Sequence, residues 1–264
     1  MFLEISSKEN SHYKELKKVT KEKSDYVIIE GKKLFLEAIN SPLKIQKVYF
    51  DKKNQQYLSK FLSGKQNIEP IFINNALLSS IFTTDSKPDG EDLIIALAKK
   101  PLHRLQDLLE TQKQLIFLER IQDPGNLGMI IRSAVAFNAG GIILSKGSVD
   151  PFNTKVIRAS AGAVFNLPVI SIDEIESFVP SLKSAKYKLV ALLVKPSKAS
   201  KNLSKIIFDL PCIFLFGNEG SGLSKEFLNM VDEIVTIPQS DKIESLNLGV
   251  AASLVLWELY KRKN

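Results

Sequence analysis

The stretch that decides the fold runs from Cys212 to Gly222 and reads Cys-Ile-Phe-Leu-Phe-Gly-Asn-Glu-Gly-Ser-Gly. Its first five residues form a short uninterrupted apolar run, which is typical of a strand buried on both faces, as in a parallel sheet. Three glycines, Gly217, Gly220 and Gly222, follow within six residues and let the backbone turn sharply and lie close against a ligand. We therefore expect a central strand that ends in a ligand-binding loop.

A second strand and the last helix complete the expected crevice. The run from Glu233 to Ile237 stops at Pro238, which cannot donate to a β-ladder. A polar segment, residues 240–247, then leads into a helix rich in small residues. Two strand ends and one helix start therefore converge, and this arrangement predicts a crevice at the carboxyl ends of parallel strands.

The composition predicts a globular protein with one large or two modest domains. The chain has 264 residues, of which 44% are hydrophobic, enough for a sizeable core. Its net charge of +7 favours an anionic partner, although many basic proteins bind none. The single cysteine rules out an internal disulfide framework and fits a reducing compartment. The N-terminus lacks a secretory segment and no apolar run is long enough for a membrane span, so we expect a cytoplasmic location.

The first hundred residues predict a small α/β domain. A lysine-rich helix is expected over residues 6–24, either as a solvated face or as a surface that follows phosphates. Further helices are expected at residues 34–39 and 55–62, and strands at residues 26–29, 45–50, 69–73 and 92–98. We place this domain at residues 1–100 and a linker with a short helix at residues 101–112.

The remaining segment, residues 113–264, alternates strands with helices. Strands are expected at residues 114–118, 141–144, 165–170, 188–194, 212–216 and 234–237. The helices between and after them are expected to end near residue 137 and to cover residues 153–163, 173–185, 223–230 and 246–261. Strict alternation of this kind predicts an α/β fold with a mostly parallel sheet and helices on both sides.

Several common chemistries find no support in the motifs. The chain has no G-x-x-x-x-G-K-[ST] loop for a nucleoside triphosphate, and the glycines after Phe216 have the reverse order of the dinucleotide fingerprint. It has no cysteine–histidine cluster, and its two histidines, His12 and His103, lie outside the glycine-rich loops. We therefore expect neither a metal site nor a histidine that acts as general base.

Three polar clusters follow strands of the expected parallel sheet. They are Asn126 with Arg132, Glu219 in the glycine loop, and Ser245 with Asn247 before the last helix. Each has an ordinary structural explanation when it is taken alone, because the arginine could be a surface ion-pair donor, Asn126 and Ser245 could cap helices, and Glu219 could be a solvated charge. Three such clusters in the strand-to-helix loops of one sheet favour a functional site.

Residues 123–132, 216–222 and 237–251 together resemble the three motifs of the SpoU (TrmH) family. They read Asp-Pro-Gly-Asn-Leu-Gly followed by Arg132, then Phe-Gly-Asn-Glu-Gly-Ser-Gly, then Ile-Pro followed by Glu-Ser-Leu-Asn-Leu-Gly-Val-Ala. Members of this family are S-adenosylmethionine-dependent RNA ribose 2′-O-methyltransferases of the SPOUT class. The resemblance covers about residues 114–260, and the first hundred residues resemble, more loosely, the L30e-like substrate-binding domain that often precedes this catalytic domain.

The resemblance implies a fold, a cofactor and partners. The C-terminal sheet would carry the trefoil knot of the SPOUT class, which cradles S-adenosylmethionine, and two protomers would pack across it as a homodimer. Gly217, Ile237 and Leu246 would hold the adenine and methionine parts of the cofactor, largely through backbone groups. The substrate would be RNA, with 23S ribosomal RNA as the first expectation. A transfer RNA substrate, or a catalytically silent RNA-binding or ribosome-assembly protein, is the alternative.

The resemblance also implies five catalytic residues, namely Arg132, Asn126, Glu219, Ser245 and Asn247. In the family Arg132 is the proposed base, acting on the ribose hydroxyl beside the partner protomer's cofactor. Because arginine stays protonated in nearly all proteins, the alternative is that Arg132 stabilises the developing alkoxide or a nearby phosphate. Glu219 would orient Arg132 or Asn126, and Ser245 and Asn247 would position the substrate and the loop.

Overall fold

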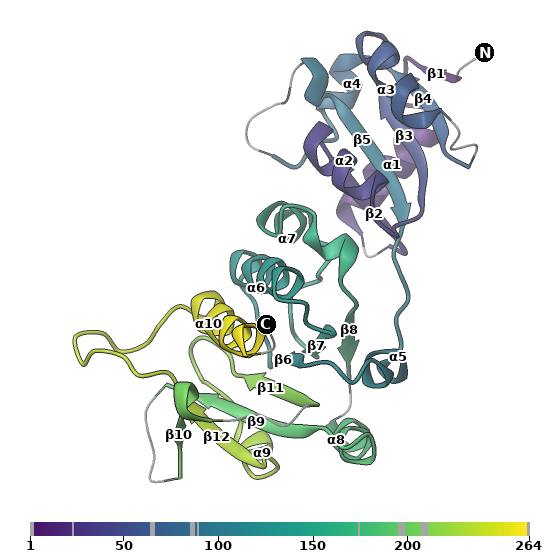
Figure 1. Cartoon of the computed structure of the whole chain (residues 1–264). Coiled ribbons are helices and arrows are strands. Elements are labelled where there is room, and N and C mark those ends of the chain that lie inside the picture. Colours follow the sequence, from purple (N-terminus) through teal and green to yellow (C-terminus); the bar gives the residue numbers. More distant parts are fainter. Residues whose placement is uncertain are drawn as a thin grey trace. The chain divides into compact units, whose positions relative to one another are not determined.

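The structure is a computed structural model that describes residues 3–22, 24–63, 67–84, 88, 90–173, 175–194, 199–206 and 211–262 (Figure 1). It divides into two compact units. The first unit comprises Met1–Leu102 together with Phe152–Arg158, and the second comprises His103–Pro151 and Ala159–Asn264.

The first unit contains a five-stranded mixed sheet. Its strands lie in the order β1-β4-β3-β5-β2; the pairs β1–β4 and β4–β3 are parallel, and β5 is antiparallel to both β3 and β2. The strands are β1 (Leu3–Ile5), β2 (Tyr26–Glu30), β3 (Ile45–Phe50), β4 (Glu69–Ile73) and β5 (Ile94–Lys99). The helices are α1 (Ser11–Lys21), α2 (Lys32–Ile39), α3 (Gln55–Leu62) and α4 (Asn75–Ser79), with 3-10 turns η1 (Lys52–Asn54) and η2 (Gly90–Asp92).

The lysine-rich helix is shorter than its sequence pattern predicted. The side chain of Asn10 accepts a hydrogen bond from the backbone N–H of His12 at 2.9 Å, so α1 begins only at Ser11. The residues before this cap form β1, which was not predicted because three residues are too short to display a period. Tyr13 and Leu16 are buried in the core of the unit, so the sparse apolar positions of α1 do define its inner face.

The second unit contains a seven-stranded sheet in the order β10-β12-β9-β11-β6-β7-β8, and every pairing in it is parallel. The strands are β6 (Leu115–Leu118), β7 (Gly141–Ser145), β8 (Val169–Ile172), β9 (Lys188–Leu193), β10 (Lys201–Asn202), β11 (Cys212–Phe216) and β12 (Glu233–Thr236). The helices of this unit are α5 (Leu105–Glu110), α6 (Pro124–Ala136), α8 (Ile175–Ser184), α9 (Lys225–Leu228) and α10 (Leu248–Lys261), with 3-10 turns η3 (Ala163–Asn166) and η4 (Leu203–Lys205). All but the last residue of helix α7 (Thr154–Ala159) belongs to the first unit. The predicted α/β class and parallel sheet are thus confirmed.

The centre of this sheet is buried on both faces, as the uninterrupted apolar runs predicted. Every residue of β6, β7 and β11 is buried. Phe117 on β6 packs its ring against Phe178 and Phe227, with ring centroids 5.4 and 4.6 Å away. Leu108 and Leu109 of α5 join the same core, so the segment expected to be a linker belongs to the second unit from His103 onward.

Several element boundaries differ from the sequence-based expectation. The helix expected at residues 153–163 ends at Ala159, and the strand expected from residue 165 begins at Val169. Between them, Gly162 adopts a left-handed φ of +82° and precedes the turn η3. Phe165, which was expected to start the strand, is buried in this turn instead. The last helix begins at Leu248, because the side chain of Asn247 caps it.

Strand β10 at the sheet edge was not predicted, since two residues carry no hydrophobic pattern. It pairs with β12, and its Lys201 forms an ion pair with Glu233. Burial opposes ionisation of Glu233, but hydrogen bonds from Lys188 and Lys201 outweigh burial and hold the pKa of this carboxyl below its usual value. The paired charges therefore tie this short edge strand to the sheet.

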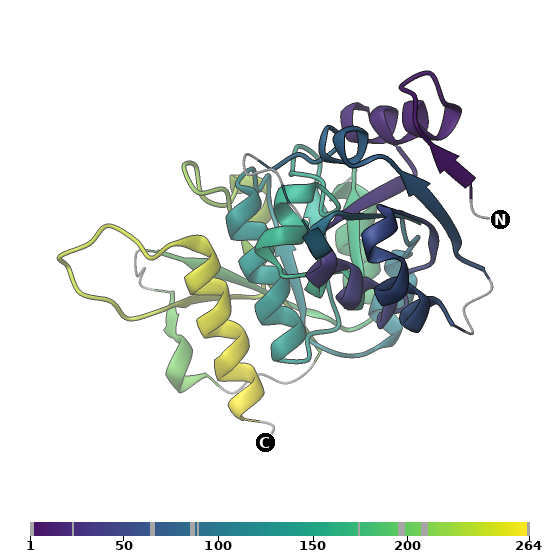
Figure 2. The ribbon, with the colours of Figure 1, turned by 90° about the horizontal axis from the view of Figure 1, so that it is seen from above.

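Two features of the second unit bear on the site. Helices α6 and α10 lie side by side in both views (Figures 1 and 2), and the segment between β12 and α10 projects away from the sheet. Among the described residues, no helix combines the length and the apolar character needed to cross a bilayer. The trefoil knot stays a prediction from the resemblance.

Replacement of Phe117 by alanine should destabilise the second unit by about 3–5 kcal/mol, because it leaves a cavity between two rings that do not move to fill it. Chemical denaturation followed by fluorescence would measure this loss. Phe117→Leu, which retains most of the apolar volume, should cost clearly less. Equal stability of Phe117→Ala and the wild type would show that this ring cluster does not hold the core together.

Candidate active site

A cavity of about 420 Å³ opens at the carboxyl ends of β9, β11 and β12 and at the start of α10. This is the edge of a parallel sheet where strand-to-helix loops leave room for ligands, and the volume suits a small molecule. Its lining residues are Leu192, Leu193, Val194, Phe216, Gly217, Asn218, Glu219, Gly222, Leu223, Ile237, Gln239, Ser245, Leu246, Asn247, Leu248 and Ala251. The crevice predicted from the sequence is therefore present, and the end of β9 contributes a wall that was not predicted.

The glycine loop after β11 folds back tightly on itself. The backbones of Asn218 and Gly222 exchange two hydrogen bonds of 3.1 and 2.9 Å, and Gly222 has a left-handed φ of +69°. A Cβ added at Gly217 would lie 2.0 Å from the backbone of both Gly222 and Leu223, which no real side chain tolerates. Glycine at position 217 is thus required by the close approach of two backbone segments.

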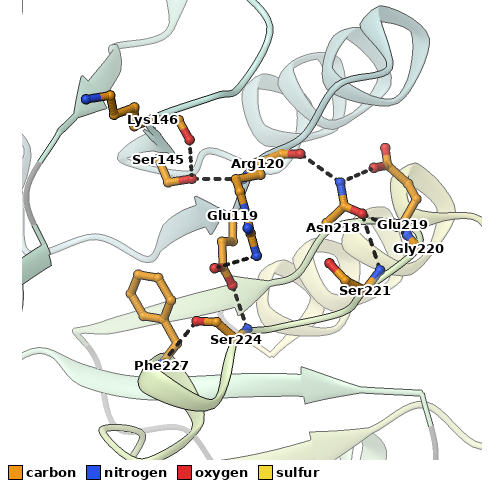
Figure 3. A network of polar contacts seen from close by, with 10 residues as sticks. All are labelled: Glu119, Arg120, Ser145, Lys146, Asn218, Glu219, Gly220, Ser221, Ser224 and Phe227. Atoms are coloured by element: carbon orange, nitrogen blue, oxygen red, sulfur yellow. Dashed lines mark hydrogen bonds and ion pairs between the residues drawn. The ribbon is translucent and has the colours of Figure 1, made fainter.

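The side chain of Asn218 fastens this loop to the neighbouring strand end (Figure 3). Its Oδ1 accepts hydrogen bonds from the backbone N–H groups of Gly220 and Ser221 at 2.9 and 3.3 Å. Its Nδ2 donates to the backbone oxygen of Arg120 at 2.9 Å. Asn218 was not singled out from the sequence, although asparagine in a glycine-rich turn is typical of this kind of side-chain-to-backbone bond.

Three of the predicted polar residues form one hydrogen-bonded chain. Asn126 donates through Nδ2 to Glu219 Oε1 at 3.0 Å and accepts through Oδ1 from Asn247 Nδ2 at 2.8 Å. Asn126 is buried, whereas Glu219 and Asn247 are exposed and line the cavity. Side chains from α6, the glycine loop and the start of α10 therefore meet at one point, as the three-cluster prediction requires.

The helix caps explain how this chain is oriented. Asp123, not Asn126, caps α6, since its Oδ1 accepts from the backbone N–H of Asn126 at 2.7 Å and Pro124 occupies the first turn. The purely structural role considered for Asn126 is therefore filled by another residue. Asn247 has both roles, because its Oδ1 caps α10 by accepting from the N–H of Val250 at 3.2 Å while its Nδ2 reaches Asn126.

The other predicted residues divide into two groups. Gly217, Ile237 and Leu246, expected to hold a cofactor, all line the cavity, and so does the exposed Ser245. Arg132 does not line it: the side chain is exposed on α6 and makes no ion pair within the part of the chain that the structure describes. No group of three or more histidine, cysteine, aspartate or glutamate side chains among these described residues could hold a metal ion.

Comparison with known proteins assigns the family. The SpoU rRNA Methylase family matches residues 113–257, which is more than half of the chain. The chain belongs to this family. It is therefore an RNA methyltransferase that uses S-adenosylmethionine as methyl donor, and the enzyme class predicted from the resemblance is confirmed.

The relatives of this chain include one that is similar along nearly its whole length and one that is similar over about half of it. The 23S rRNA (guanosine(2553)-2′-O)-methyltransferase RlmP of Bacillus subtilis is 27% identical over 260 residues, which cover 97% of this chain and 98% of RlmP. An uncharacterized tRNA/rRNA methyltransferase of Synechocystis, slr1673, is 38% identical over 148 residues, but this match spans only 56% of the chain and 53% of that protein.

Solved structures have the same fold. An rRNA methyltransferase from Sinorhizobium meliloti with bound AdoMet superimposes with a TM-score of 0.82 at 27% identity and covers 98% of this chain and 97% of its own. The SpoU methyltransferase AviRb of Streptomyces viridochromogenes in complex with AdoMet has a TM-score of 0.83 at 23% identity, with 96% and 98% coverage.

The cavity of this chain fits S-adenosylmethionine. Its apolar wall, suited to an adenine ring, is formed by Leu192, Leu193, Leu223 and Leu248, and Gly217 also lines the cavity. Main-chain N–H and C=O groups of the loop can read the polar edge of adenine, while Glu219, Ser245 and Asn247 offer polar groups.

Gly217→Ala should weaken the binding of S-adenosylmethionine by at least about tenfold, because the new methyl group forces the loop backbone apart next to the cavity. Isothermal titration calorimetry would measure the dissociation constant. Gly220→Ala is the matched control, since its Cβ would meet only Asn218 Oδ1 at 3.5 Å, an ordinary contact. Wild-type affinity in Gly217→Ala would contradict the assignment of this loop to the cofactor.

Proposed function

We propose that this enzyme transfers the methyl group of S-adenosylmethionine to a ribose 2′-oxygen of ribosomal RNA, with 23S rRNA as the first candidate. The observation that carries the proposal is the Asn126–Glu219–Asn247 chain at the rim of the cavity that Gly217, Ile237 and Leu246 line. Similarity over nearly the full length to RlmP, which is named for 2′-O-methylation of 23S rRNA, supports both the reacting atom and the substrate. Action on ribosomal RNA also agrees with the expected cytoplasmic location.

Positioning provides much of the proposed rate. Bound S-adenosylmethionine supplies an electrophilic methyl group, and the protein has to hold the ribose oxygen in line with it. The amide of Asn126 locks Glu219 and Asn247 in fixed orientations, so their remaining hydrogen-bonding groups and the Ser245 hydroxyl form a preorganised rim for the sugar. The leucines of the cavity keep water away from the reacting atoms.

The guanidinium of Arg132 would stabilise the oxygen as it loses its proton. Arginine remains protonated in proteins, so it cannot take up the proton of the ribose hydroxyl. We propose that its positive charge stabilises the developing alkoxide or an adjacent phosphate, while another group or water accepts the proton. Arg132 lies outside the cavity of its own protomer. It would therefore act on the site of a partner protomer.

A homodimer would bring Arg132 to a second cavity. The exposed surface of the neighbouring helices α6 and α10 is apolar around Arg132, with Met129, Val135, Val250, Leu254 and Trp257 all exposed. Exposed apolar side chains that gather on one face are typical of a protein interface. A second copy of the chain packed against this face, with twofold symmetry, would give each cavity the partner's Arg132.

The first unit would bind the RNA substrate through its phosphates. Residues 1–102 of this unit contain no arginine, but Lys33, Lys44, Lys53 and Lys60 are exposed and make no ion pair with another described residue. Free lysines of this kind bind phosphates without reading sequence. This supports the L30e-like, substrate-binding assignment of the N-terminal domain, which we retain as part of the proposal.

Arg132→Ala should lower kcat by at least about a hundredfold and leave the affinity for S-adenosylmethionine unchanged, because the arginine acts on the sugar oxygen and lies outside the cofactor cavity. Methyl transfer from labelled cofactor and calorimetry would measure the two quantities. A stronger test mixes Arg132→Ala with Gly217→Ala. In a mixed dimer, the intact cavity of one protomer receives Arg132 from the other, so activity should reappear.

The outcome of the mixing experiment separates two arrangements. If Arg132 acted within its own protomer, neither half of the mixed dimer would contain a complete site and no activity would return. Sedimentation of each variant alone is the control, since both must remain dimeric for the comparison to count.

Deletion of the gene should remove one 2′-O-methyl group from ribosomal RNA, and mass spectrometry of digested rRNA and tRNA from the two strains would locate it. The wild-type gene should restore the modification, whereas an Arg132→Ala gene should not. Loss of a methyl group from a transfer RNA instead would support the alternative substrate. Unchanged RNA in both pools would support a protein without catalytic activity.

A further inference from the structure

Arg120 lies at the carboxyl end of the central strand β6, beside the glycine loop. It has a φ of +49°, in the left-handed region that favours glycine and disfavours a long side chain. Non-glycine residues in this conformation gather at functional sites, where the surrounding structure enforces them. The sequence therefore retains a large side chain at a position where glycine would be easier to accommodate.

Hydrogen bonds on both sides hold the backbone of Arg120 in place (Figure 3). Its N–H donates to Ser145 Oγ at 2.8 Å, and its carbonyl oxygen accepts from Asn218 Nδ2 at 2.9 Å. Asn218 precedes Glu219, whose carboxylate orients Asn126. The backbone of Arg120 is thus connected directly to the loop that forms the proposed methyl-transfer site.

The guanidinium of Arg120 is only weakly engaged within the protein. Its side chain is 52% exposed, and among the described residues it pairs only with Glu119, Nη2 lying 3.4 Å from Oε1. By contrast, Arg104 on the same unit makes two hydrogen bonds to Asp107, at 2.7 and 3.2 Å. Most of the N–H donors of Arg120 therefore remain available to a ligand.

Neutralisation of Glu119 is the alternative role for this arginine. Glu119 is buried, but its Oε2 already accepts a 2.8 Å hydrogen bond from the backbone N–H of Ser224, at the start of α9. The contact of Arg120 to the other carboxylate oxygen, at 3.4 Å, is a longer and weaker hydrogen bond than the one from Ser224. The pairing with Glu119 therefore uses only part of this half-exposed guanidinium.

The negative charges at this edge of the sheet would repel the phosphates of an RNA substrate unless a cation lay nearby. Three carboxylates, Glu119, Asp123 and Glu219, follow β6 and β11 here, and a ribose that reaches the cavity brings a phosphate on each side. Like charges at close range repel, and an arginine offers a planar fork that matches a phosphate. Arg120 is a basic residue held next to the glycine loop, because its backbone carbonyl oxygen accepts a hydrogen bond from the side chain of Asn218.

We infer that Arg120 is a substrate-binding residue that holds a backbone phosphate next to the target ribose. The inference rests on the proposed function, because it names the part of the RNA that this residue contacts. Arg120 has a left-handed backbone conformation next to the loop. The side chain of Asn218 hydrogen-bonds both to the backbone of Arg120 and to the carboxylate of Glu219, so it fixes the distance between the phosphate-binding residue and Glu219.

Replacement by glycine tests the inference sharply. Arg120→Gly removes the charge and relieves the strained backbone, so thermal stability should not fall while affinity for the substrate RNA falls at least about tenfold. The slope of log K against log salt concentration should become shallower by about one, as expected for one lost phosphate contact. Affinity for S-adenosylmethionine should stay unchanged. Electrophoretic mobility shifts between 50 and 200 mM salt, roughly the range over which such slopes are measured, would give both RNA quantities.

Lys186→Gly is a closely matched control. Lys186 is exposed, has a left-handed φ of +61° and precedes β9, at the opposite end of the parallel strands. The variant therefore removes the same charge and the same strain at a place where no substrate is expected, and RNA affinity and salt slope should remain those of the wild type. Equal effects of the two glycine variants would overturn the inference.

A double variant separates phosphate binding from neutralisation of Glu119. Glu119→Gln retains an acceptor for Ser224 and removes the buried charge. If Arg120 only neutralises Glu119, Glu119→Gln combined with Arg120→Gly restores RNA binding, and the inference is wrong. If Arg120 holds a phosphate, RNA binding stays weak in the double variant and returns in part in Arg120→Lys. Failure of the wild type itself to methylate any RNA would instead reject the proposed function.

Discussion

The side-chain amide of Asn126 is the contact on which the rest of the site depends. It is buried, and both of its ends are satisfied, by Glu219 on one side and by Asn247 on the other. A buried amide that lost either partner would leave an unsatisfied polar group, which costs about 1–3 kcal/mol. The three segments that carry these residues are far apart in sequence, so one amide fixes the relative position of α6, the glycine loop and α10.

The parallel sheet explains why these three segments can meet at all. Parallel strands all point the same way, so the loops after β6, β11 and β12 emerge at one edge. The strands at the centre are buried on both faces, which makes the edge a rigid base for short loops. Close approach at Gly217 then folds the glycine loop back, so that the exposed Glu219 accepts a hydrogen bond from Asn126 of α6.

The sequence contained enough information for the sheet and for the residues around the cavity. A short apolar run such as Cys212–Phe216, followed by a glycine-rich segment, predicts a buried strand. The motifs predicted that Asn126, Glu219 and Asn247 belong to one site, and the structure brings them into contact. Short elements were beyond such reasoning, because β1 and β10 have three and two residues and display no period. The wall from the end of β9 was also hidden, since only the strand order brings it beside β11.

The position of Arg132 follows from helix geometry and could have been anticipated. Residues on an α-helix are separated by about 100°, so six residues place Arg132 about 240° around α6 from Asn126. Measured the shorter way, the two side chains are about 120° apart, so they point in clearly different directions from the helix axis. Asn126 is buried and Arg132 is exposed, in agreement with this rotation. The proposed twofold dimer would reconcile the two positions, because it would place Arg132 of one protomer beside the cavity of the other.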